Sequence, residues 1–210
     1  MQDTSSDAQR SIALGGDTVA VGIAATMYYL LRHDDVYKKL QQEVRSTFRS
    51  RQSVQTGSLL DACAYLRACV NESLRLSPPG PGIFWRQCDN DMEVDGVFLP
   101  AGTEFGVSIY ALHHNPDVFR DPETFRPDRF LFAKGSPGFI PFLSGFRACP
   151  AQRLAYCMMS LPIARLVWEF DMQIVRPTLS SDGAEGNYEQ KDAFGSKVSG
   201  PMVRFRSIRT

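Results

Sequence analysis

The chain has 210 residues, of which 43% are hydrophobic and 22% charged, as in an ordinary globular domain. Its 23 basic and 23 acidic residues balance to a formal net charge of zero, which argues against a general nucleic-acid or anionic-membrane binder. The five cysteines are odd in number and contain no CxxC pair, so we expect neither a disulfide framework nor a cysteine-rich zinc site. Such cysteine usage predicts a reducing, intracellular compartment.

The first apolar segment, at 11–31, predicts a helix that is buried all round, because apolar residues occupy nearly every side of it. Asp17 interrupts this segment, and its longest run free of charge is 18–31. A membrane span needs about 20 consecutive apolar residues. We therefore expect a buried helix and no transmembrane segment in this chain.

Two further helices are predicted before a proline-rich turn. The stretch 35–49 has an apolar stripe at helical spacing, with Asp34 or Asp35 as its N-cap. A polar connection leads to a third helix at about 59–76. The run SPPGPG at 77–82 ends that helix, because proline disfavours helix both at its own position and at the preceding one.

The remaining chain changes in texture. Residues 83–109 alternate in polarity and are broken by glycine and proline, which indicates short strands with tight turns. The stretch 114–150 has little periodicity, and irregular segments of that length are usually functional. A helix at 151–170 and a pair of strands around a long loop in 171–210 complete the chain. The fold class expected is mainly α with a minor β part.

Cys149 lies at the junction between the irregular stretch and the helix that follows it. Backbone N–H groups and the helix dipole favour negative charge at a helix start, and Arg147 and Arg153 add positive charge nearby. Pro150 suits the first helical turn. These features favour a thiolate, which serves either as a nucleophile or as a metal ligand.

The residues alone leave three interpretations of Cys149 open. A lone cysteine is most often a buried structural residue, as we expect for Cys63, Cys69 and Cys157. A nucleophilic cysteine needs a histidine base within reach, and His113 or His114 could provide it. The third interpretation is a metal ligand.

The segment PFLSGFRAC resembles the haem-binding loop of the cytochrome P-450 family, which reads Phe, two residues, Gly, one residue, Arg, one residue, Cys. The resemblance implies that the Cys149 thiolate binds the iron of haem b on its proximal side. It also implies that Phe142 packs beside the cysteine, that Gly145 permits a tight turn and that Arg147 pairs with a haem propionate. The family usually has glycine two residues after the cysteine, where this chain has Ala151.

Other motifs resemble the same family in the same order. Glu72 and Arg75 match its Glu-x-x-Arg pair, which the family joins to an arginine of a later motif, here Arg129 in PDRF. The resemblance implies that these residues form a buried charge network with a structural role. This network would hold the loop that contains PFLSGFRAC, here called the cysteine loop. Arg86 stands where the family has an arginine for the second propionate.

The segment Gly15-Gly16-Asp17-Thr18 resembles the oxygen-activating segment of the family's central helix, although Leu14 replaces the usual small residue. Glycines allow a local widening of the helix, while a hydroxyl and an acid can deliver protons. The resemblance therefore implies catalytic roles for Thr18 and Asp17. The alternative is that Asp17 is a helix-start residue and Thr18 simply packs.

Taken together, the resemblance implies that 1–210 is the C-terminal portion of the cytochrome P-450 fold, from the central helix onwards, without the N-terminal half and its membrane anchor. It implies a monooxygenase that inserts one oxygen atom from O2 into a small organic substrate, in fungal secondary metabolism or xenobiotic turnover. Electrons would come from NADPH through a partner reductase, and a full-length relative would lie at the endoplasmic reticulum membrane. The rival hypothesis is a truncated, catalytically silent relative that binds haem weakly or serves as an interaction module.

Overall fold

The computed structural model describes residues 4–132, 137–175, 188 and 201–208. Its helices are α1 (Thr4–Arg32), α2 (Asp34–Thr47), α3 (Ser58–Asp61), α4 (Ala64–Leu76), α5 (Ile109–His113), α6 (Arg129–Phe132) and α7 (Gln152–Glu169), with 3-10 turns η1 (Arg51–Ser53) and η2 (Gly145–Arg147). Its strands are β1 (Ile83–Gln87), β2 (Met92–Val94), β3 (Val97–Leu99), β4 (Glu104–Ser108), β5 (Phe170–Ile174) and β6 (Val203–Ser207). The expectation of a mainly α fold with a minor β part is confirmed.

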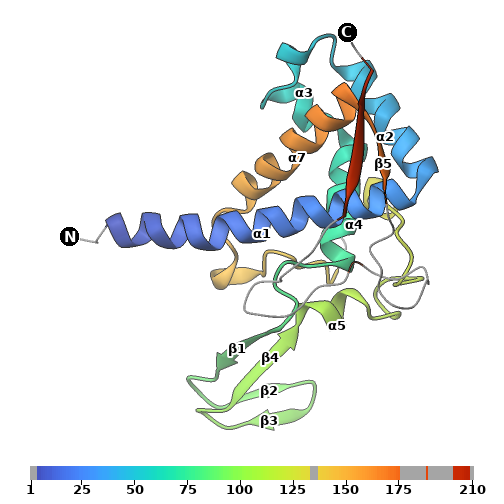
Figure 1. The fold of residues 1–210 in the computed structure, drawn as a ribbon. Helices are drawn as coiled ribbons and strands as arrows, with labels where there is room; N and C mark the ends of the chain where they lie inside the picture. Colours follow the sequence, from blue (N-terminus) through green and yellow to red (C-terminus); the bar gives the residue numbers. More distant parts are fainter. Residues whose placement is uncertain (1–3, 133–136, 176–187, 189–200, 209–210) are drawn as a thin grey trace.

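The core forms where α1, α2, α4 and α7 meet (Figure 1). The C-terminal half of α1 is buried among the other three helices, because its side chains from Val21 to Leu30 are apolar on most sides. In α4 the side chains of Leu66, Val70 and Leu74 share one buried face, and Cys63 at the N-cap is buried with them. The packing of these helices fixes the position of α7 relative to α1 and α4. It therefore also fixes the end of the cysteine loop, which leads into α7.

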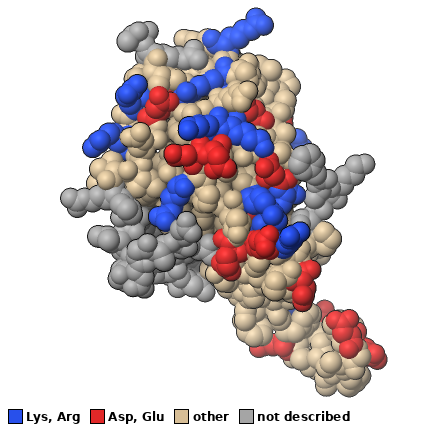
Figure 2. Space-filling model, turned by 90° about the vertical axis from the view of Figure 1, so that its right-hand side faces the viewer, with Lys and Arg blue, Asp and Glu red and all other residues tan. Residues whose placement is uncertain are grey.

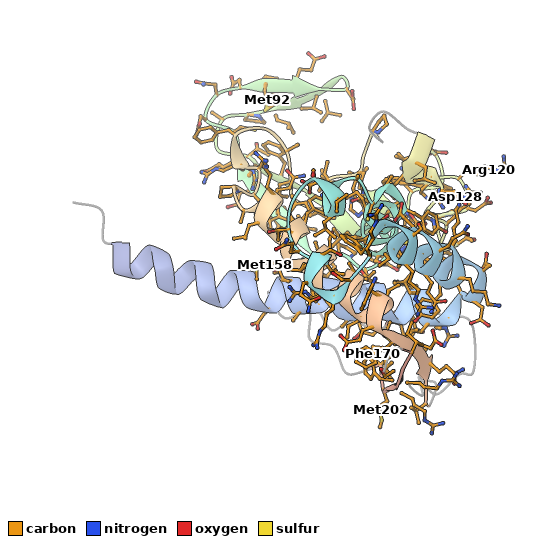
Figure 3. All side chains as sticks on the ribbon, turned by 90° about the horizontal axis from the view of Figure 1, so that it is seen from above. Met92, Arg120, Asp128, Met158, Phe170 and Met202 are labelled. Atoms are coloured by element: carbon orange, nitrogen blue, oxygen red, sulfur yellow. The ribbon has the colours of Figure 1, made fainter. Side chains whose placement is uncertain are left out.

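Three boundaries differ from the sequence-based expectation. Helix α1 begins at Thr4 rather than near residue 11, and Gly16 and Asp17 are exposed, so burial all round holds only for its second half. Figures 1 and 3 show the first turns of α1 extending beyond the other helices. The third helix is divided into α3 and α4, and Leu59 is left exposed. The N-cap of α2 is His33, not an aspartate, and it makes no side-chain cap hydrogen bond.

Gly22 is the point of closest approach between α1 and α7. A Cβ atom there would stand 2.6 Å from the Met159 sulfur and 3.7 Å from a Leu74 methyl. Figure 3 labels the adjacent Met158 and shows α7 crossing α1 in this region. Because Gly22 has no side chain, the two helices pack closely one turn after Thr18. Helix α7 continues through Pro162.

Within the described residues the strands form three antiparallel pairs, and the short strands predicted within 83–109 are present. Strand β1 pairs with β4, and β2 pairs with β3, and together they form an arm that projects from the helical body (Figure 1). Figure 2 shows acidic side chains gathered on this arm, which carries Asp89, Asp91, Glu93, Asp95 and Glu104. Strand β5 follows α7 and pairs with β6, which confirms the two-stranded tail. The loop predicted between β5 and β6 lies outside the described residues from 176 to 200, with the exception of Tyr188.

Candidate functional site

The loop before α7 folds back on itself so that Phe142 and Cys149 meet. The backbone N–H of Cys149 donates to the carbonyl of Phe142 over 2.8 Å, and the N–H of Ala148 donates to that of Gly145 over 3.1 Å. Two residues of this turn have positive φ, Leu143 at 61° and Gly145 at 64°. Glycine adopts that conformation without strain, which explains its use at residue 145, whereas a leucine must be held there by its surroundings.

Cys149 is half-buried and lies three residues before the first residue of α7. Its carbonyl accepts from the N–H of Gln152 over 3.4 Å, so the cysteine is joined directly to the helix start. Ala151 has φ −89° and ψ 8°, a conformation that alanine accepts, so the departure from the family's usual glycine introduces no backbone strain. The N–H groups of the first turn place their partial positive charge beside the thiol.

Aromatic contacts anchor this loop to the helices below it. The ring of Phe142 packs against Tyr156 on α7 with 5.1 Å between centroids. The hydroxyl of Tyr156 donates to the Asn71 carboxamide on α4 over 2.8 Å, and the Arg67 guanidinium lies 3.9 Å from its ring centroid. Burial raises the pKa of Tyr156 to about 12, so its hydroxyl stays protonated and remains a donor. None of these links was predicted from the sequence.

The opposite side of the loop is open. Phe146 is 98% exposed, Leu154 is exposed, and a Cβ atom on Gly145 would meet nothing within 4 Å. Arg147 is exposed and takes part in none of the ion pairs among the described residues, although its guanidinium lies 5.9 Å from the Phe146 ring centroid. A half-buried thiol, an exposed guanidinium and an exposed aromatic ring suit a flat apolar group that carries a thiolate-binding metal and carboxylates. The residues present therefore fit haem.

Behind the loop, Glu72 on α4 is the centre of a buried charge network. Arg75 donates to both oxygens of the Glu72 carboxylate, each over 2.9 Å, and Arg129 donates to Oε1 over 3.0 Å. The side chains of Glu72 and Arg75 are fully buried, and that of Arg129 is 10% exposed. Burial lowers the pKa of Arg129, and the Glu72 carboxylate opposes that effect. Paired geometry of this kind is what makes a buried charge tolerable.

The same network holds the irregular stretch that precedes the cysteine loop. The backbone N–H of Arg126 donates to Glu72 Oε1 over 2.9 Å. Arg75 donates to the His113 carbonyl over 2.8 Å, and Arg129 donates to the Arg120 carbonyl over 3.0 Å. In this irregular stretch, backbone N–H and carbonyl groups thus form hydrogen bonds with charged side chains. In a helix or strand the same groups would bond to other backbone groups.

His113 was considered only as a base for a cysteine nucleophile, and the structure assigns it other partners. Its Nδ1 contacts the Arg75 carbonyl at 3.2 Å, and its Nε2 accepts from the N–H of Ile140 over 3.0 Å. Both nitrogens are therefore occupied, and burial lowers the pKa of this imidazole to about 4. His114 contacts the Tyr110 carbonyl through Nδ1, and its ring stacks on Tyr110. These contacts remove the support for a nucleophilic Cys149.

The other residues selected from the sequence lie on different elements. Thr18 is half-buried on α1, where its hydroxyl donates to the Gly15 carbonyl over 3.4 Å, and Asp17 beside it is exposed. Arg86 is half-buried in the middle of β1 and donates to the Trp85 carbonyl over 2.8 Å. The structure thus unites Phe142, Gly145, Arg147 and Cys149 in one loop and Glu72, Arg75 and Arg129 in one network. Asp17, Thr18 and Arg86 belong to neither group.

Comparison with known proteins agrees with this geometry. The family model described as cytochrome P-450 matches residues 10–186. The chain is 38% identical over 212 residues to the cytochrome P-450 monooxygenase poxM of Penicillium oxalicum, covering 99% of this chain and 41% of the relative. It is 37% identical to atnE of Emericella nidulans, covering 93% and 40%, and 37% identical to lcsN of Purpureocillium lilacinum, covering 97% and 64%. Both of these are also named cytochrome P-450 monooxygenases. The chain thus spans less than half the length of the first two relatives, and it belongs to the cytochrome P-450 family.

Proposed function

We propose that this chain is part of a haem b-dependent monooxygenase that inserts one oxygen atom from O2 into a small organic substrate. The observation that carries the proposal is the cysteine loop, in which a half-buried thiol stands at the positive end of α7 beside an exposed guanidinium, that of Arg147, which joins none of the ion pairs within the described part of the chain. The names of the related fungal monooxygenases support the same reaction class. Secondary metabolism or xenobiotic turnover is the proposed setting.

In this proposal the Cys149 thiolate would hold the haem iron. Arg147 and Arg86 pair with the two propionates, since guanidinium groups match carboxylates in geometry and charge. Phe142 holds the loop behind the cysteine through its contact with Tyr156, and Gly145 keeps the turn free of side-chain atoms. When bound, thiolate-ligated haem supplies the activation of molecular oxygen.

The proton-handling groups in this proposal are Thr18 and Asp17. The Thr18 hydroxyl donates to the Gly15 carbonyl of its own helix over 3.4 Å, a long hydrogen bond that holds the Oγ1 proton weakly. The Asp17 carboxylate is exposed and can take protons from solvent. The neighbouring Gly15 and Gly16 would meet nothing within 4 Å if they carried a Cβ atom.

Electrons are proposed to come from NADPH through a partner reductase, because the reaction consumes two electrons for each oxygen atom inserted. For a full-length relative we propose the endoplasmic reticulum membrane. Among the described residues, none of the helices combines the length and apolar character that crossing a membrane requires. The assignment of residues 1–210 to a single partial domain, from the central helix to the C-terminus, also remains a proposal.

The test is the absorbance spectrum of the reduced carbon-monoxide complex after haem is added to the chain. Thiolate ligation gives a red-shifted band, and Cys149→Ser is expected to remove it. Cys157→Ser is the matched control, because Cys157 is also half-buried and lies on α7, away from the loop. The control should keep the band. Persistence of the band in Cys149→Ser would place the ligand elsewhere.

A further inference from the structure

We infer that His113 is a positioning residue that fixes the cysteine loop to the buried charge network. The inference deepens the proposed function, on which it rests for the statement that the loop holds haem. The contacts themselves do not depend on haem. His113 ends the short helix α5, and its side chain is completely buried between the network and the loop.

The two hydrogen bonds of the ring define its tautomer. The N–H of Ile140 can only donate, so Nε2 must be the unprotonated acceptor of this 3.0 Å bond. The proton therefore lies on Nδ1, which donates to the Arg75 carbonyl over 3.2 Å. The imidazole thus bridges two backbone groups that come from α4 and from the start of the cysteine loop.

The bridge is reinforced on both sides. Arg75 returns a hydrogen bond from Nη1 to the His113 carbonyl over 2.8 Å, so the residue that binds Glu72 also binds both ends of His113. The ring stacks on Phe139, the residue before Ile140, with 5.4 Å between centroids. His113 is therefore held in one orientation by both of its ring nitrogens, by its backbone carbonyl and by the stacking of its ring on Phe139.

From Ile140 the connection reaches the cysteine in two more hydrogen bonds. The Ile140 carbonyl accepts from the N–H of Leu143 over 2.9 Å, which closes the turn where Leu143 has positive φ. The neighbouring Phe142 carbonyl accepts from the N–H of Cys149 over 2.8 Å. The charge network is thereby joined, through one neutral imidazole, to the turn that sets the position of the thiol.

The experiment measures hydrogen exchange at single backbone amides in the chain without haem. His113→Asn keeps a donor near Nδ1 but is too short to accept from Ile140, whereas His113→Gln carries an oxygen that reaches toward the position of Nε2. In His113→Asn we expect the Ile140 amide to exchange at least about tenfold faster, as follows from the loss of one buried hydrogen bond. The increase in exchange rate at Ile140 should exceed the increase at Leu30, which lies in the core. In His113→Gln the exchange rate at Ile140 should lie between those of His113→Asn and the unsubstituted chain.

The matched control is His114→Asn, because the described polar partners of the His114 ring are the Tyr110 carbonyl and the Glu123 carboxylate, and neither belongs to the link between Arg75 and Ile140. This variant should leave the Ile140 amide unchanged. Equal exchange at Ile140 in His113→Asn and in the unsubstituted chain would overturn the inference. So would an increase at Leu30 as large as that at Ile140, because His113 would then only stabilise the fold.

Haem addition gives a second readout that separates the two proposals. If the unsubstituted chain shows the red-shifted carbon-monoxide band, His113→Asn should lower the fraction of haem that gives it, and His114→Asn should not. If the unsubstituted chain shows no such band, the proposed function fails, and the exchange at Ile140 still decides whether His113 positions the loop.

Discussion

The strongest energetic prediction concerns Glu72→Gln, which removes the only carboxylate that contacts Arg75 and Arg129 in the described ion pairs. Glu72 Oε1 accepts from Arg75, from Arg129 and from the N–H of Arg126, and Oε2 accepts a second bond from Arg75. A glutamine keeps one acceptor oxygen and places an amide N–H₂ group against guanidinium donors. Two buried guanidinium groups would then lack a counter-charge.

Breaking a buried charge pair on one side costs about 3–5 kcal/mol, because the remaining charge stays buried. The lower end applies if water reaches Arg129, whose side chain is 10% exposed, and the upper end if Arg75 remains dry. Folded domains are stable by only about 5–15 kcal/mol, so Glu72→Gln should lose a large part of the total.

The assay is urea unfolding followed by the fluorescence of Trp168, which is buried in α7, with Trp85→Phe as background because Trp85 is 61% exposed. The midpoint should fall while the slope stays constant. Asp128→Asn is the control. It makes the same carboxylate-to-amide change in the exposed pair with Lys39, where the expected loss is about 0–1 kcal/mol. The reasoning is refuted if the two variants lose the same amount.

Two further predictions use the core. Burial lowers the pKa of His113 from 6.5 to about 4, with Arg75 and His114 acting in the same direction, so between these pH values the unfolded chain binds more protons than the folded one. The contribution of His113 to the free energy of unfolding should be fully present above pH 6.5 and should fall by about 3 kcal/mol toward pH 4. In His113→Gln the urea midpoint should no longer show this part of the pH dependence. Gly22→Leu should cost about 1–3 kcal/mol through overpacking against Met159, while Gly16→Leu, at an open position of the same helix, should cost less than half as much in thermal unfolding.

Periodicity and turn residues were enough to predict most elements. The apolar stripe of α4 and the helix after Cys149 follow from spacing alone, because burying one face of a helix imposes that period. The strand pairs follow from alternation and from Gly96 and Gly102, which have positive φ in the turns between strands. The loop PFLSGFRAC was identified as a site because helix-start electrostatics and family resemblance agree on the same residue.

Other features depend on distances that local sequence does not encode. The burial all round expected for the helix at 11–31 does not hold at Asp17, because burial there depends on how far α1 extends past α4 and α7. The Glu72 and Arg75 pair has the same spacing as a solvent-exposed pair, and only the chain around Thr124–Arg129 makes it a buried network.

His113 shows this division most clearly. The sequence determined only that residue 113 is a histidine, a residue type that permits a base, a ligand or a hydrogen-bond bridge. The tertiary structure decided among them by bringing the Arg75 carbonyl and the Ile140 N–H to opposite sides of one ring, residues that are 65 positions apart in the chain. A side chain's chemistry is fixed by its type, but its role is fixed by the partners that folding places within about 3 Å of it.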